Sequence, residues 1–113
     1  MRIQVKGRNG ASVDEELIAR VEKKLEKVAR QVSSLAELEV ELSEERNPAI
    51  KDSQVAEATL HLKGVTLRAC ERSTDMTHSI NMLAEDLARQ VKKHRDKRRA
   101  RRESARGQQP RAA

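Results

Sequence analysis

The clearest pattern of polar and apolar positions lies between Glu37 and Glu44, where the two kinds of residue alternate. Successive side chains of a β-strand point to opposite faces of a sheet, so this alternation predicts a half-exposed strand. One face carries Leu38, Val40 and Leu42, and the other carries Glu37, Glu39 and Glu41. We therefore expect an acidic outer face on this strand.

Three further segments have the pattern of strands, namely Arg2–Lys6, Val55–Leu62 and a segment that begins at Val65. The second would place Ala56, Ala58, Leu60 and Leu62 on one face, and the third would place Val65, Leu67 and Ala69 inward. Only Lys63–Gly64 separates these two strands, and so short a connection predicts a β-hairpin.

An amphipathic helix is predicted between the first two strands. The run from Ser12 to Glu15 has the pattern of a capping box, in which the Ser12 hydroxyl accepts an N–H group of the first turn and Glu15 reaches back. The helix is expected to continue to about Gln31. Its buried stripe would consist of Leu17, Val21, Leu25, Val28 and Val32, with Ile18 beside it.

A second, longer helix is predicted after an N-cap within Ser73–Asp75. Its apolar stripe consists of Met76, Ile80, Leu83, Leu87 and Val91, with Ala84 and Ala88 alongside. Past His94 the same stripe is occupied by Arg98 and Arg101, which would not be buried. We therefore expect this helix to leave the body of the domain after His94.

The predicted order of elements is β-α-β-β-β-α, which indicates an α+β fold. A four-stranded, mostly antiparallel sheet with both helices on one face would bury both helical stripes. The first strand can also pair in parallel, because the helix after it can serve as a crossover. We expect residues 1–95 to form the folded domain and residues 96–113 a basic helix extension that ends in a tail or linker from Gly107.

Positive charge is concentrated in one block of the chain. Ten of the eighteen residues from Arg89 to Arg106 are Lys or Arg, with only Asp96 and Glu103 opposing them, whereas the whole chain carries a net charge of +6. So dense a block binds polyanions, and nucleic acid is the commonest polyanion in a cell.

The first helix carries a second group of basic residues, which fall within roughly a third of its circumference. If both helices cover one face of the sheet, their outward sides form one basic surface, opposite the acidic strand face. The domain would then dock on nucleic acid in one orientation. The candidate contacts are Arg20, Lys23, Lys24, Lys27, Arg30, Arg89, Lys92, Lys93, Arg95, Lys97, Arg98, Arg99, Arg101 and Arg102.

Other interpretations of these charges remain open. The first helix could be a solvated face with ion pairs at i,i+4 spacing, as Glu16–Arg20 and Glu26–Arg30 allow. The basic block could be a solubilising tail. The chain could be a general nucleic-acid packaging protein, or an interaction module that uses its acidic sheet face or a sheet edge.

The amino-acid composition limits the kinds of binding and catalysis that the chain can perform. The chain has no Phe, Tyr or Trp, so it cannot stack bases on aromatic rings and should grip phosphates, grooves and shape. We find no reaction centre, cofactor motif or metal-ligand spacing, and predict a protein that is not an enzyme. His61, His78 and His94 are scattered, and the single cysteine, Cys70, has the position of a small strand residue. No apolar run is long enough to span a membrane, the N-terminus does not read as a signal peptide, and we expect a cytoplasmic location.

Several of these segments together resemble the ribosome hibernation promoting factor family, also known as ribosome-associated inhibitors or sigma-modulation proteins. The similarity covers about residues 1–100 and includes the opening Ile3–Asn9. Its strongest part is Gly64–Ala69, then Asp75–Asn81, then the basic run Leu87–Lys93. The family pattern has Tyr and Asp where this chain has Thr77 and Asn81.

The resemblance implies a fold similar to a double-stranded RNA-binding domain. It also implies binding in the channel of the small ribosomal subunit where mRNA and tRNA sit, which stops translation and preserves idle ribosomes. The basic residues of both helices would then contact rRNA, with no small-molecule substrate and no membrane partner. Long family members add a C-terminal dimerisation domain after a linker, and the chain would be either a short member or an N-terminal piece of a long one.

Overall fold

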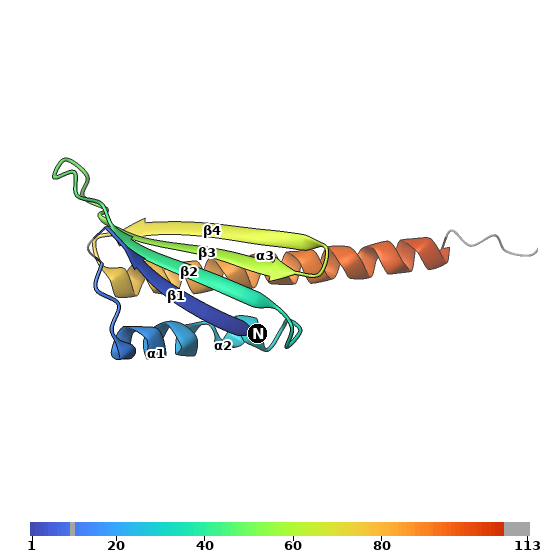
Figure 1. Cartoon of the computed structure of the whole chain (residues 1–113). Coiled ribbons are helices and arrows are strands. Elements are labelled where there is room, and N and C mark those ends of the chain that lie inside the picture. The colour runs from blue at the N-terminus through green and yellow to red at the C-terminus, as the bar shows by residue number, and fades with distance from the viewer. Residues whose placement is uncertain (10, 108–113) are drawn as a thin grey trace, which may run out of the picture.

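The computed structural model describes residues 1–9 and 11–107 and places four strands and the helices in two layers (Figure 1). In chain order the elements are β1 (Arg2–Arg8), α1 (Glu15–Lys24), α2 (Glu26–Ala29), β2 (Glu37–Glu44), β3 (Gln54–Leu62), β4 (Val65–Ser73) and α3 (Met76–Gly107). The predicted α+β class and the order of the elements are confirmed, with one difference in that the first helix is divided.

The sheet has the strand order β1-β2-β3-β4. β1 pairs with β2 in parallel, starting at Arg2 opposite Glu37, whereas the other two pairs are antiparallel. The parallel pairing that the sequence left open is thus the one adopted, because α1 and α2 carry the chain back along the sheet. β3 and β4 form the predicted hairpin, and Gly64 has a φ of +79° that favours glycine in its turn.

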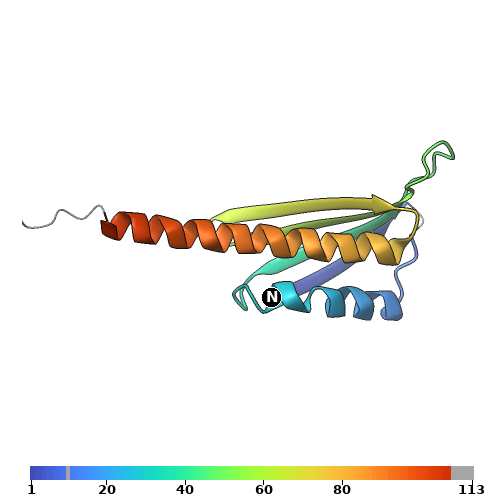
Figure 2. The same cartoon turned by 180° about the vertical axis from the view of Figure 1, so that it is seen from behind.

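All helices lie on one face of the sheet, as Figure 2 shows from the helical side. Between the layers lies a core of aliphatic side chains, supplied by the stripes and strand faces that the sequence pattern predicts. Its largest fully buried members are Val21, Leu25, Val28, Leu38, Val40, Leu42, Leu60, Ile80, Leu83 and Leu87. The other face of the sheet is open to solvent.

The N-cap of α1 differs from the prediction. Asp14, not Ser12, precedes the helix in an extended conformation, and its Oδ1 accepts a hydrogen bond from the Leu17 backbone N–H at 2.8 Å. The predicted capping box at Ser12 is therefore wrong. Ser and Asp both cap helices well. The cap is Asp14, two positions after Ser12, and its carboxylate also lies at the positive end of the helix dipole.

The expected single helix up to about Gln31 is also wrong, because it is interrupted at Leu25. There the backbone has φ −92° and ψ 1°, and the Val28 N–H bonds to the Leu25 carbonyl three residues back at 3.0 Å. Such an i→i+3 bond tightens the turn. Leu25 itself is completely buried, so the apolar stripe continues into α2 despite the break.

α3 begins at the predicted cap, where the Asp75 carboxylate accepts from the His78 N–H at 3.3 Å. The buried Ser79 hydroxyl donates to the Gln54 carbonyl of β3 at 2.7 Å and lies 2.7 Å from the Ser73 hydroxyl of β4. Further along, the Gln90 side-chain amide donates to the Arg68 carbonyl on the free edge of β4 at 2.8 Å. These bonds fix α3 lengthwise against the sheet.

The basic part of α3 leaves the body of the domain, as predicted. Among residues 76–102, whose burial the structure describes, Val91 is the last buried one, and all residues from Arg95 to Arg102 are exposed. The helix is continuous through residues 95 and 96, the predicted domain boundary, and that division stays a prediction. The expected tail begins at Gly107, which is the last helical residue, and its remainder, 108–113, lies outside the described residues.

The position of the cap can be tested by substitution. We expect Asp14→Ala to lower the free energy of unfolding by about 1 kcal/mol, because an N–H group at the start of α1 loses its acceptor. The matched change Ser12→Ala should alter it by less than about 0.5 kcal/mol. Urea unfolding followed by circular dichroism at 222 nm measures both, and a larger effect at Ser12 would contradict the assignment of the cap.

Candidate nucleic-acid interface

The segment formed by α1 and α2 runs beside α3 in the same direction (Figure 2). Both α1 and α3 begin at the end of the sheet near the loop between β2 and β3. A hydrogen bond joins them near their starts: the Arg20 guanidinium of α1 donates to the Thr77 hydroxyl of α3 at 2.7 Å. This bond shows which side of α1 faces α3. It therefore defines the groove between the two helices.

Helical spacing extends each wall of this groove from the Arg20–Thr77 bond. On the first wall, Lys24 follows Arg20 at i+4 within α1, and Lys27 follows on α2, past the break at Leu25. On the second wall, Lys92 and Arg95 follow Thr77 at i+15 and i+18. A hollow lined by both Gln31 and Arg95 supports this pairing of the walls. We name the basic residues Arg20, Lys24, Lys27, Lys92 and Arg95 the groove set.

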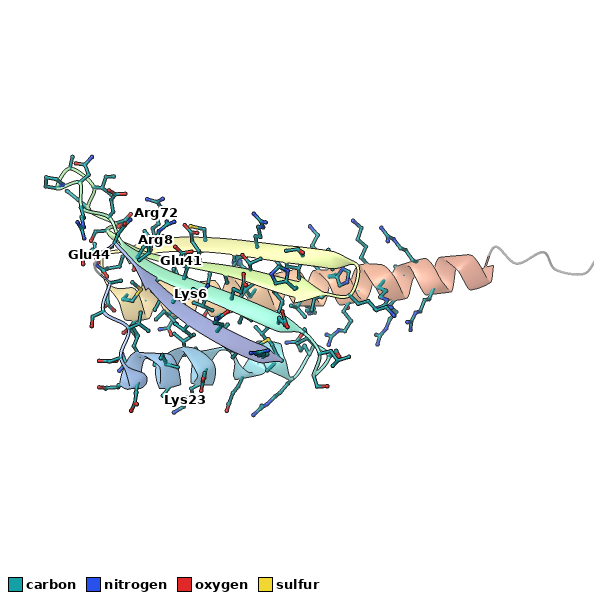
Figure 3. All side chains as sticks on the ribbon, viewed as in Figure 1. Lys6, Arg8, Lys23, Glu41, Glu44 and Arg72 are labelled. Atoms are coloured by element: carbon teal, nitrogen blue, oxygen red, sulfur yellow. The ribbon has the colours of Figure 1, made fainter. Side chains whose placement is uncertain are left out.

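The other predicted contacts lie elsewhere on the helical layer. Helical spacing puts Lys23 and Arg30 on the side of α1 and α2 away from the core, and Figure 3 shows Lys23 projecting away from the sheet. Arg89 and Lys93 lie on the solvent side of α3. The remaining five lie on the part of α3 beyond the body, which we name the arm: Lys97, Arg98, Arg99, Arg101 and Arg102.

All fourteen predicted residues are exposed, and few are neutralised by a neighbour. Among the described side chains, three of them take part in ion pairs: Arg20 with Glu16 at 4.0 Å, Arg30 with Glu26 at 3.9 Å, and Arg89 with Asp86 at 4.0 Å. The two i,i+4 pairs that the sequence allowed do form. Exposed pairs of this length contribute little, at most about 1 kcal/mol, so they compete weakly with a phosphate.

Charge is also polarised along the helices. α1 has Glu15 and Glu16 in its first turn and Lys23 and Lys24 in its last. From residue 76 to 91 α3 has two acidic residues and one Lys or Arg, whereas from 92 to 107 it has two acidic residues and nine Lys or Arg. Because the helices run in the same direction, their basic ends lie together, toward the arm.

The outer face of the sheet is not the acidic surface that was expected. Glu37, Glu39 and Glu41 do point outward, but β1 and β4 present basic residues on the same face: Arg2, Lys6, Arg8, Arg68 and Arg72. Arg8 pairs with Glu41 at 2.9 Å, and Figure 3 shows this pair and Arg72, which is on the opposite edge strand, at the same end of the sheet. The face is thus of mixed charge, and the prediction failed because it considered one strand without its neighbours.

Lys63, in the turn between β3 and β4, is a further basic residue near the arm that the sequence pattern did not indicate. It lines a hollow together with Lys97, Arg98 and Arg101 of the arm. The turn signal at Lys63–Gly64 gave no reason to expect a binding residue. Only the tertiary structure brings this hairpin beside the arm.

The described residues offer no sign of a reaction centre. Partial desolvation raises the pKa of the Cys70 thiol, and the Glu57 carboxylate raises that pKa further, so the nucleophilic thiolate is disfavoured. No three His, Cys, Asp or Glu side chains in this part of the chain are grouped so that they could hold a metal ion. Within the same residues, no helix combines the length and apolarity that crossing a membrane requires.

Comparison with known proteins finds one family over most of the chain. The model of the family described as Sigma 54 modulation protein / S30EA ribosomal protein matches residues 3–99. A "Ribosome hibernation promotion factor" from Picosynechococcus is 34% identical over 98 residues, which are 86% of this chain and 50% of that protein. A "Ribosome hibernation promoting factor" from Klebsiella oxytoca is 43% identical over 47 residues, 42% of this chain and 50% of that protein. The chain spans about half the length of the first of these relatives.

Solved structures show the same fold. The Thermus thermophilus Protein Y N-terminal domain has a TM-score of 0.70 at 26% identity and covers 83% of this chain and 99% of its own. A ribosomal subunit interface protein from Coxiella burnetii has a TM-score of 0.70 at 24% identity and covers 85% of this chain and 99% of its own.

The groove set can be tested against the sheet face with equal changes of charge. We expect Lys92→Gln with Arg95→Gln to weaken binding to duplex RNA and to reduce the slope of log K against log salt by about 1 for each phosphate that is no longer bound. Lys6→Gln with Arg68→Gln removes the same charge from the outer sheet face and should leave the slope unchanged. Fluorescence anisotropy over a salt series measures both, and equal effects of the two pairs would contradict an oriented interface.

Proposed function

The chain belongs to the Sigma 54 modulation protein / S30EA ribosomal protein family, and from this membership we propose that it is a ribosome hibernation factor. It binds the small ribosomal subunit at the mRNA and tRNA channel and inhibits translation by occupying that channel. It acts without catalysis, in the cytoplasm, with rRNA as its main ligand.

The observation that carries this proposal is the groove between two parallel helices with exposed basic residues on both walls. An RNA duplex or a stem of folded rRNA presents rows of phosphates at fixed separation. Lys24 and Lys27 lie on one wall, and Lys92 and Arg95 lie on the other, further along the groove toward the arm. Cations on both walls can contact phosphates of two strands at once, which favours a folded RNA over a flexible single strand.

The arm extends the basic surface beyond the body of the domain. α3 has 32 residues, and at a rise of about 1.5 Å per residue it is about 48 Å long. Residues 92–102 lie beyond Val91, the last residue described as buried, and carry Lys or Arg on every side of the helix. A helix with charge on all sides suits a channel whose walls carry phosphates on several sides.

Occlusion needs no chemistry beyond binding. With no aromatic residues in the chain, affinity comes from phosphate contacts and shape, and exclusion comes from the volume of the folded domain. Pairing of ribosomes, which the family resemblance assigns to a C-terminal domain of long members, would not reside in residues 1–107.

A second candidate is a general nucleic-acid binding or packaging protein. The observation in its favour is the arm, since positive charge on all sides of a helix carries no preferred orientation. This candidate predicts similar affinity for free duplex RNA, for DNA and for ribosomes. Hibernation requires instead a strong preference for the small subunit.

Sedimentation with purified subunits distinguishes the two candidates. We expect binding to the small subunit and the whole ribosome but not to the large subunit alone, with affinity falling roughly 10³–10⁵-fold between about 50 and 200 mM salt if six to ten phosphates are contacted. Added mRNA and tRNA should displace the protein. Equal binding to both subunits would favour the packaging protein.

Translation in vitro tests the consequence of binding. The chain should inhibit synthesis from a reporter mRNA, and Lys92→Glu with Arg95→Glu should relieve the inhibition at least about 10-fold, since each reversal turns a phosphate attraction into a repulsion. Lys6→Glu with Arg68→Glu, an equal change on the sheet face, should inhibit like the unchanged protein. Inhibition that survives reversal in the groove would overturn the proposed mechanism.

A further inference from the structure

A hollow of about 510 Å³ lies at the root of the arm, beside the start of β2 and the turn between β3 and β4. Its apolar lining includes Leu35, Ala36 and Leu62, and its polar members are Ser33, Glu37, His61, Lys63 and Arg98. Leu35 is 88% exposed, the most exposed large apolar side chain among the described residues. An apolar side chain held at the rim of a hollow suggests a partner that covers it.

A second hollow, of about 440 Å³, adjoins the first through Lys63 and Arg98, which line both. Its other members include Gly64 of the hairpin turn and Lys97 and Arg101 of the arm. One hollow is thus largely apolar, the next is cationic, and the cationic residues Lys63 and Arg98 belong to both.

This pairing of surfaces matches the chemistry of one nucleotide. A nucleobase has flat apolar faces and polar edges, and the phosphate attached to its sugar is an anion. An Arg guanidinium can stack on a base or bind a phosphate, and a His ring or aliphatic side chains, such as those that line the first hollow, can cover the face of a base. The neighbouring cations would hold the phosphate.

We propose that the two hollows bind one unpaired nucleotide of an RNA strand, with its base against Leu35 and its phosphate among Lys63, Lys97 and Arg101. The inference rests on the proposed function in that it takes the bound polyanion to be RNA. It adds a base-directed contact to an interface that the groove and arm otherwise make through phosphates.

The cations continue along the arm, which favours an RNA strand over a free nucleotide. Arg95, Arg99 and Arg102 line a further hollow together with Arg98, so positive charge follows a path along α3 and does not converge on one point. A strand can place successive phosphates along such a path while one base turns into the apolar hollow. A free nucleotide would use only one end of it.

Glu37 gives the apolar hollow a preference among bases. Its side chain takes part in no ion pair among the described residues, and a carboxylate accepts hydrogen bonds only. Guanine presents two adjacent donors on its pairing edge, which can bond to the two carboxylate oxygens, whereas uracil presents one donor between two carbonyls. We therefore expect guanine to be preferred and uracil to be disfavoured.

Two RNAs of equal charge test this site. One is a nine-nucleotide strand of uridines, and the other has guanosine at its central position, so that their phosphate contacts are the same. We expect the guanosine strand to bind at least about 5-fold more tightly, the lower end of what one bidentate base contact provides. Leu35→Glu and Glu37→Gln should each bring the ratio of the two affinities close to 1.

Ile50→Glu is the matched control. Ile50 is the other large apolar side chain that is exposed among the described residues, and it lies in the loop between β2 and β3, at the opposite end of the sheet. It receives the same charge in the substitution. The ratio should persist in this variant. The ratio compares the affinities of two RNAs for the same protein, so a general loss of affinity caused by the added charge cancels. Because Leu35 is exposed, we expect Leu35→Glu to leave the protein folded, and a thermal melt checks this.

The outcomes separate this inference from the proposed function. Equal affinity for the two strands overturns the nucleotide site, even where both bind well. Guanosine monophosphate that binds as tightly as the guanosine strand also overturns it, in favour of a free nucleotide. If the unchanged protein fails to sediment with small subunits, the proposed function fails; if it sediments but shows no preference for guanosine, only the nucleotide site fails.

Discussion

The burial of one apolar stripe of α3 determines where the positive charge of this protein lies. Ile80, Leu83, Leu87 and Val91 are almost completely enclosed, so the helix cannot rotate about its axis without exposing them. The buried Ser79 hydroxyl, bonded to the Gln54 carbonyl, prevents a shift along the axis. Each basic residue beyond Val91 therefore has a fixed direction relative to the sheet, set by the first half of the same helix.

The same packing makes the arm possible as a helix. Like charges at i,i+3 and i,i+4 weaken a helix, and the arm carries many of them. Starting a helix is the costly step, whereas adding residues to an existing one is much less so. The buried half supplies the start, so the charged half continues a helix that already exists. An isolated peptide of the same sequence would lack this support.

The sequence was sufficient to predict the strands, the buried stripes of the helices and the point where α3 leaves the body of the domain. Each of these depends on a periodic pattern within one element. The sequence did not identify the N-cap of α1, because Ser12 and Asp14 are both residue types that cap helices. It also missed the break at Leu25, where burial keeps the stripe intact while the backbone tightens. The groove set and the mixed sheet face depend on the relation between elements, such as the Arg20–Thr77 bond, which no single pattern contains.

The hydrogen bond from the Gln90 amide to the Arg68 carbonyl affects how copies of the protein can associate at high concentration. β4 is an outer strand, and unpaired carbonyls along such an edge invite a strand of another copy to extend the sheet. The Gln90 amide occupies one of these carbonyls, and Arg68 and Arg72 add charge to the same strand. A copy that approached edge to edge would have to break that bond and bring like charges together. The edge of β4 thus disfavours pairing with a strand of a second copy.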